Sequence, residues 1–234
     1  MMSTAFRIIP VVAVLLACLW GSAPPAAAQS KKMTILEYYN SFVMWKKLGF
    51  EHLIDRKIGP EGRQEHASRG AYMYNIIVDA PNGFLQYATG CSCHQEINSY
   101  AIFKTAGGDV YLSASGRNLN FYKFVGANKW IDETKTVVPE TGLGAFLAEG
   151  ASPASIPANV RKCSAIFYAV PRYGTVVTAE LRLYSKHQDD PERSEQGWKR
   201  LEALRPAFRK AYRYTKLNLP WDRERGIITI GKKE

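Results

Sequence analysis

The sequence predicts an α+β fold, with a largely antiparallel, curved sheet of about six to eight strands and a helix at each end of the chain. Two observations predict it. Three hairpin patterns follow one another without helices between them, and a helix start signal stands before and after this run. A β-barrel or a sandwich with flanking helices is the alternative architecture.

The N-terminal helix is predicted to begin after Thr34. Glu37 stands three residues later, so the two side chains can form a capping box that satisfies free backbone N–H groups. Apolar side chains then recur at helical spacing up to Val43, and Gly49 is expected to end the helix in a left-handed conformation. Another turn or two of helix is expected within residues 50–57.

Three hairpins follow, each with alternating hydrophobicity and a turn rich in Gly, Pro, Asn or Asp. Their strands are expected at 72–79 and 84–89, at 99–104 and 110–115, and at 165–170 and 175–184. Shorter strands are expected at 121–125, 135–138 and 226–230, with a long loop at 141–159 that holds one helical turn near Phe146. The alternation is clearest at 175–184, and it is typical of an antiparallel sheet with one solvated face.

A C-terminal helix is predicted from the Asp-Pro-Glu sequence at 190–192, which combines a capping carboxylate with proline at the first helical position. Apolar side chains from Trp198 to Tyr212 then fall on about one helix face. Pro206 interrupts this pattern and should kink or split the helix at Arg205, because proline lacks the backbone N–H that the helix needs.

The first 28 residues are typical of a secretory signal peptide. Arg7 precedes an apolar stretch from Ile8 to Trp20, and an Ala-x-Ala cleavage pattern ends at Ala28. The apolar stretch is too short to cross about 30 Å of hydrocarbon as a helix. We therefore expect an exported bacterial protein, periplasmic or secreted, with one α+β domain over residues 29–234 and no transmembrane segment in it.

A lipoprotein is the alternative form of export. Residues 15–18 read Leu-Leu-Ala-Cys, which loosely resembles a lipobox with Cys18 as the lipid-bearing residue. The Ala-x-Ala pattern downstream favours ordinary cleavage.

Three cysteines remain after cleavage at Ala28: Cys91, Cys93 and Cys163. An exported chain passes through an oxidising compartment, so one disulfide and one remaining thiol are expected. We expect Cys163 to pair with Cys93, or with Cys91 in its place.

A metal site is the weaker interpretation of the same cluster. Cys91, Cys93 and His94 offer thiolates and an imidazole, which suit Zn²⁺ or Cu⁺. A closed site needs about four ligands, and no further His or Cys stands at ligand spacing. The prediction is therefore that the protein uses no metal and no other cofactor.

The main functional expectation is a non-enzymatic module that binds a ligand or an envelope partner of unknown specificity. Motifs of serine hydrolases, metalloproteases, phosphate loops and dinucleotide-binding folds are absent from the sequence. The alternative is a hydrolase of cell-envelope or extracellular polymers, in which Cys93 or Cys163 is the nucleophile and His94 or His187 its base. Aromatic side chains on the first hairpin and at 121–130 are expected to pack in the core rather than to line a cleft.

The net charge of +10 is concentrated near the C-terminus. Residues 29–192 carry 18 basic and 16 acidic side chains, whereas residues 193–234 carry 12 and 5. Lys199, Lys210 and Arg213 fall opposite the apolar helix stripe and form the predicted basic face. Such a face either increases solubility or binds an anionic partner, such as an acidic protein, lipid headgroups or a glycan. Nucleic acid is not expected as the partner of an exported chain.

Overall fold

The computed structural model describes residues 32–49, 52–55, 61–62, 72–91, 94–184 and 191–234. At 61–62, 72–74, 90–91, 94–95 and 191–194 it describes the backbone without the side chains. The chain divides into two units, Met1–Lys32 and Met33–Glu234, and the second unit holds every element described below. The predicted signal peptide, Cys93 and His187 lie outside the described residues.

The first half of this unit is one helix followed by seven strands. They are α2 (Ile35–Lys46), β1 (Glu61–Gly62), β2 (Tyr72–Asp79), β3 (Phe84–Cys91), β4 (His94–Lys104), β5 (Val110–Ser115), β6 (Leu119–Gly126) and β7 (Lys129–Asp132).

The second half begins with short helices and ends in strands around a long helix. Its elements are α3 (Thr134–Val137), η2 (Leu143–Phe146), η3 (Pro153–Ser155), α4 (Ala158–Lys162), β8 (Ser164–Ala169), β9 (Val176–Leu183), α5 (Pro191–Ala211), β10 (Lys216–Asp222) and β11 (Ile227–Ile228).

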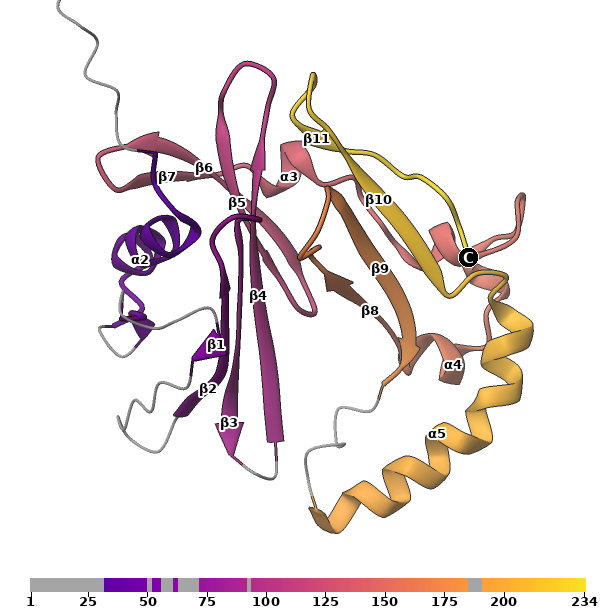
Figure 1. Ribbon diagram of the computed structural model, residues 1–234. Helices are drawn as coiled ribbons and strands as arrows, with labels where there is room; N and C mark the ends of the chain where they lie inside the picture. Colours follow the sequence, from indigo (N-terminus) through magenta and orange to yellow (C-terminus); the bar gives the residue numbers. More distant parts are fainter. Residues whose placement is uncertain (1–31, 50–51, 56–60, 63–71, 92–93, 185–190) are drawn as a thin grey trace, which may run out of the picture. The chain divides into compact units, whose positions relative to one another are not determined.

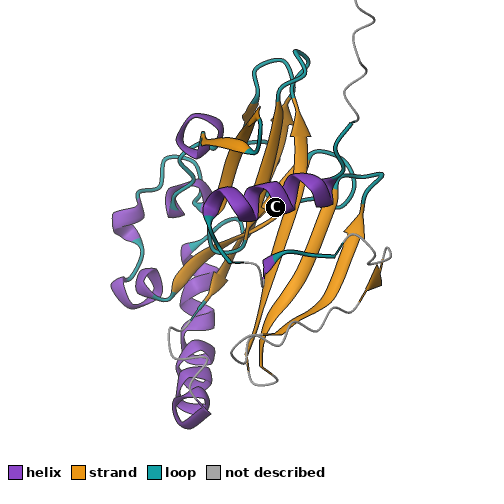
Figure 2. Ribbon diagram, turned by 90° about the vertical axis from the view of Figure 1, so that its left-hand side faces the viewer, coloured by secondary structure: helices purple, strands orange, loops and turns teal. Residues whose placement is uncertain are grey.

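The strands form two antiparallel sheets, so the predicted α+β class is confirmed (Figure 1). The first sheet is a meander in chain order from β1 to β7, and the second has the order β11-β10-β9-β8. The helix α2 lies across the strands of the first sheet (Figure 2). The second sheet packs on the opposite face, so the first sheet separates two hydrophobic cores.

The helix α2 begins as the sequence predicts and ends two residues earlier. Thr34 N donates to Glu37 Oε2 at 2.8 Å and Glu37 N donates to Thr34 Oγ1 at 3.3 Å, which completes the capping box. The left-handed C-cap is Lys47, with φ 55°, and Gly49 has the expected positive φ, 98°, two residues beyond it. A lysine in this conformation carries a steric cost that glycine would avoid.

The core beneath α2 is aromatic and contains a short chain of buried hydroxyl groups. Tyr39 Oη donates to Tyr87 Oη at 3.1 Å, and Tyr87 Oη lies 3.3 Å from Tyr100 Oη. Burial raises the pKa of all three phenols above the ordinary value for tyrosine, so the hydroxyls stay protonated. Trp130 Nε1 donates to Ser41 Oγ at 3.2 Å and joins α2 to β7.

The core between the two sheets is built on stacked rings. Phe121 of the first sheet and Trp221 of the second are nearly parallel, with ring centroids 5.8 Å apart. Trp221 Nε1 also donates to the carbonyl of Lys104 at 3.0 Å. Outside this core Arg172 Nε donates to Asp79 Oδ2 at 2.8 Å, and this charge-assisted bond holds the pKa of the Asp79 carboxyl below its usual value.

Two of the expected strands are wrong in type or length. The segment predicted as a strand at 135–138 is the helix α3, because Asp132 Oδ1 accepts from Thr134 N at 3.1 Å and Thr134 Oγ1 accepts from Phe121 N at 3.0 Å. These side chain–backbone bonds favour a turn over the β-propensity of Thr and Val. The strand predicted at 226–230 is only the two-residue β11, and β7, α4 and β10 were not expected from the sequence.

The C-terminal helix α5 stays one helix through Pro206, so of the two predicted outcomes, a kink or a split, the split does not occur. Its ribbon bends partway along its length, as expected when proline removes a backbone hydrogen bond (Figure 1). Leu201, Leu204, Phe208 and Tyr212 are buried as predicted, but Trp198 is 50% exposed. The apolar stripe is therefore interrupted at the position of Trp198.

Candidate functional site

The candidate site is a groove of about 290 Å³ between α5 and the C-terminal end of β9. Apolar side chains and three arginines line it. The lining residues are Leu181, Arg182, Leu183, Trp198, Leu201, Arg205, Phe208, Arg209 and Thr215.

The flank of α5 that faces the groove carries Trp198, Arg205 and Arg209. Their spacings of seven and four residues place them above one another along the helix. Because Leu201 and Phe208 beside them are buried against the core, the helix is held with this row at the edge of the groove.

The other wall comes from the last residues of β9. Leu181 is buried and Leu183 is partly buried against the inter-sheet core, while Arg182 between them is exposed. Strand alternation alone explains this order. The site therefore combines an apolar floor from both elements with a guanidinium group on each wall.

The three arginines differ in how their charges are used. Arg205 Nε donates to Glu202 Oε2 at 3.0 Å, and this bond holds the pKa of the Glu202 carboxyl below its usual value. Arg182 donates to Glu180. The Arg209 side chain has no ion pair or hydrogen bond to a described residue, although its charge is close enough to lower the pKa of Glu202 further. The groove therefore has one cation in excess.

The described side chains of the groove are of the kind that binds an anion. Among the residues that the structure describes, the lining includes no Cys, His, Asp or Glu, and its one hydroxyl belongs to Thr215. A guanidinium group cannot act as a base, because it stays protonated, but its five N–H groups bind carboxylates and phosphates well. The groove is chemically suited to an anionic group attached to an apolar one.

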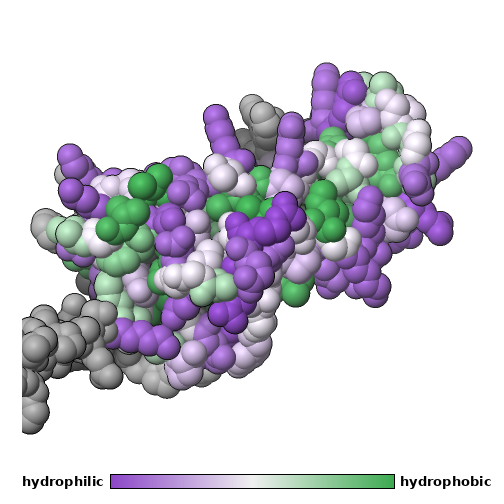
Figure 3. Space-filling view, turned by 90° about the horizontal axis from the view of Figure 1, so that it is seen from above, coloured by the Kyte–Doolittle hydropathy of each residue, from purple (hydrophilic) through white to green (hydrophobic). Residues whose placement is uncertain are grey.

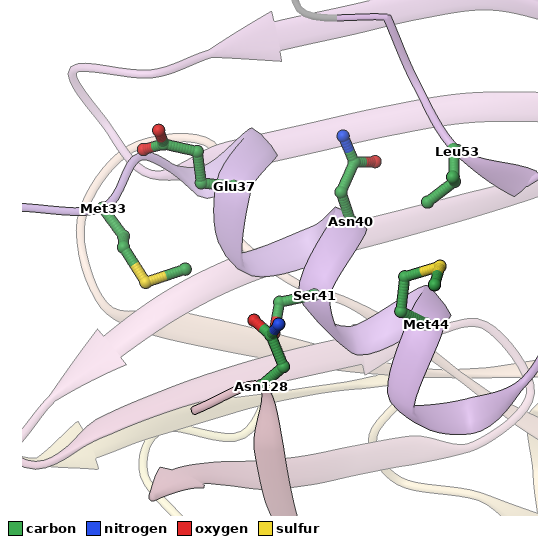
Figure 4. Close-up of a pocket in the computed structure, with 7 residues that line it drawn as sticks. All are labelled: Met33, Glu37, Asn40, Ser41, Met44, Leu53 and Asn128. Carbon is green, nitrogen blue, oxygen red and sulfur yellow. The ribbon is translucent and has the colours of Figure 1, made fainter. Parts of the chain in front are cut away.

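A second cavity, of about 310 Å³, lies beside α2 (Figure 4). Met33, Glu37, Asn40, Ser41, Met44, Leu53 and Asn128 line it. The amide group of Asn40 bonds to both backbone groups of Ile54, at 2.9 and 3.0 Å. Ser41 Oγ accepts from Trp130, and Glu37 accepts in the capping box. These polar groups hold α2 in place.

The predicted cysteine and histidine sites remain largely untested. Cys163 follows α4 and is a partly buried free thiol with no disulfide to a described residue. Cys91 pairs with His94 across the end of the β3–β4 hairpin, but their side chains are not described. Cys93 and His187 lie outside the described residues. The disulfide, the Cys/His hydrolase and the weak metal site therefore stay predictions.

The predicted basic face is exposed. Lys210 on α5 and Arg213 just after it are exposed, and Lys199 Nζ lies 2.8 Å from Glu195 Oε1. Exposed pairs of this kind contribute little to stability. None of the three residues is among the described residues that line the groove.

The aromatic residues predicted to lie in the core do so wherever their side chains are described. Phe84, Tyr87, Phe121, Tyr122 and Trp130 are each less than a tenth exposed. On the face drawn in Figure 3, hydrophobic side chains lie in several separate patches between hydrophilic ones. Among the residues coloured in that view, the apolar side chains do not form the continuous surface that is typical of a large protein interface.

Sequence reasoning missed the groove. The spacing of Trp198, Arg205 and Arg209 was available as a signal for a cationic row with an aromatic at one end. No sequence pattern indicates that the end of β9 faces this row, because that contact depends on tertiary packing.

Comparisons with known proteins do not assign the chain to a family. The sequence matches no protein-family profile, and neither a curated protein nor a solved structure is significantly similar to the chain. Within the described part, no helix is both long and apolar enough to cross a bilayer. Among the described side chains, no three His, Cys, Asp or Glu residues gather as a metal site would require.

Proposed function

We propose that this chain is an exported, non-enzymatic module that binds an anionic ligand or envelope partner in the groove between α5 and β9. The observation that carries the proposal is the exposed guanidinium of Arg209 beside an apolar floor, without an anionic partner among the described residues. An anion bound there would gain charge-assisted hydrogen bonds, while its apolar part would cover Leu201 and Phe208.

Thermal unfolding tests the binding function. A ligand that binds only the folded protein raises Tm. The purified protein is heated with heparin, with a Glu-rich peptide, with phosphatidylglycerol vesicles and with decanoate. We expect at least one of these anions to raise Tm, and Arg209→Glu to abolish the rise. Lys210→Glu is the matched control, because it reverses the same charge at the next residue of the same helix, which does not line the groove.

The function is wrong if no anion raises Tm, or if Lys210→Glu removes the effect as completely as Arg209→Glu. In the second case binding depends on the total positive charge of α5 rather than on the groove.

Export is proposed from the signal-like sequence before Ala28. N-terminal sequencing of the protein from the periplasmic fraction of a bacterial host should find Gln29 as the first residue. A lipid-modified Cys18 at the N-terminus would show the lipoprotein alternative, and an intact Met1 would contradict export through cleavage.

A further inference from the structure

We infer that the groove binds a single-chain carboxylate amphiphile, a fatty acid with a chain of about ten carbons, with its carboxylate at Arg209 and its tail toward Trp198. The inference rests on the proposed function and names the class of ligand. Four features of the groove support it: its volume, its length, its charge and the position of its tryptophan.

The volume suits a small ligand of roughly ten non-hydrogen atoms. The groove holds about 290 Å³, and a water-sized group occupies about 30 Å³. Pockets for drug-sized ligands and cofactors start at about 300 Å³ and extend to about 1,000 Å³. A dinucleotide or a flavin is therefore too large, whereas a medium-length alkyl chain fits.

The length of the groove favours an extended ligand. The row from Trp198 to Arg209 rises along eleven residues of α5, about 16 Å at the helical rise. Because the groove has a small volume over this length, it is narrow. A narrow apolar groove suits an unbranched chain better than a ring system of the same volume.

The charge of the groove selects an anion. Glu202 and Glu180 already pair with Arg205 and Arg182, so the additional cation is Arg209. A carboxylate can accept two parallel N–H bonds from one guanidinium group. A neutral chain would leave Arg209 unpaired, and a cationic chain would meet three like charges.

The position of Trp198 gives the ligand a direction. Its ring is 50% exposed at the end of the row opposite Arg209. An alkyl tail lying over this ring would remove apolar surface from water, while the carboxylate stays at the charged end. Tail burial should therefore depend on Trp198, and recognition of the charge should depend on Arg209.

Isothermal titration calorimetry with decanoate tests the inference, with 1-decanol and decyltrimethylammonium as chain-matched controls. We expect decanoate to bind and both controls to bind at least about tenfold more weakly, because one charge-assisted bond is lost. Arg209→Glu should weaken decanoate binding about tenfold or more, while Lys210→Glu should leave it unchanged. In the series hexanoate, decanoate and hexadecanoate, affinity should be highest for decanoate, and Trp198→Ala should flatten this dependence.

The inference is overturned if 1-decanol binds as tightly as decanoate, or if Arg209→Glu retains full affinity with an unchanged circular dichroism spectrum. It is also overturned if phosphatidylglycerol vesicles bind and monomeric decanoate does not, since the site would then recognise a lipid surface. If decanoate fails but heparin or the Glu-rich peptide still raises Tm through Arg209, the ligand class is wrong and the proposed function stands.

Discussion

The cavity beside α2 and the groove beside α5 have nearly the same volume, about 310 and 290 Å³, but they use their polar groups differently. Beside α2, the Asn40 amide and Ser41 hydroxyl bond to the protein itself. Beside α5, the guanidinium of Arg209 has no such bond among the described residues. The two cavities therefore differ in the bonding of their lining groups and not in their volume, and the proposed function rests on this difference.

The largest expected effect is a difference in the free energy of unfolding between tryptophan variants beside α2 and on α5. Trp130 is 4% exposed and packs against the rings of Tyr38, Phe42 and Phe124, whereas Trp198 is 50% exposed. Trp130→Ala should lower the free energy of unfolding by about 3–5 kcal/mol, because it leaves a large cavity. Trp198→Ala should lower it by less than about 1 kcal/mol. Chemical unfolding followed by circular dichroism measures both values.

Because Trp130→Ala can fail to fold, Trp130→Phe is the second variant. It keeps an aromatic ring and removes the N–H that bonds to Ser41, so the expected loss is about 1 kcal/mol plus a smaller packing cost. A loss for Trp198→Ala as large as that for Trp130→Ala would contradict the contrast between the two regions.

The next largest expected effect is on the free energy of unfolding when a polar side chain is removed from each cavity, Asn40 beside α2 and Arg209 beside α5. Asn40→Ala removes both partners of the Ile54 backbone, and Ile54 is buried, so the free energy of unfolding should fall by about 2–3 kcal/mol. Arg209→Ala removes no bond to a described residue and should change it by less than about 0.5 kcal/mol. Equal losses in the two variants would show that Arg209 also has a structural role.

Much of the architecture could be predicted because its signals are local. The capping box at Thr34 and the alternating strand patterns lie within a few residues of sequence, and β2 and β5 have the predicted bounds. The strand β10 was not predicted, although Leu217, Leu219 and Trp221 alternate at its buried positions. Pro220 within it argues against a strand, and here it lies near the strand end, where β10 pairs with Val176.

The division into two sheets could not be predicted, because it depends on which strands meet. The same limit applies to the groove. Arg205 and Arg209 are four residues apart on α5, a spacing that predicts one helix face. Leu181 and Leu183 belong to β9, which precedes α5, and they lie beside the helix only in the folded chain. When a groove is formed by two elements that are distant in sequence, the sequence pattern of each element can be recognised, but their contact cannot be predicted from it.

The smallest expected effect concerns the end of α2. Lys47 is exposed and adopts φ 55°, a conformation that costs an ordinary residue about 1 kcal/mol and glycine almost nothing. Lys47→Gly should therefore raise the free energy of unfolding by up to about 1 kcal/mol. Met44→Gly, three residues earlier and also exposed, should lower it by about 1 kcal/mol because glycine is unfavourable within a helix. If α2 is purely structural, both variants should shift the unfolding midpoint and leave decanoate affinity unchanged; a change in affinity would show that the two regions are coupled.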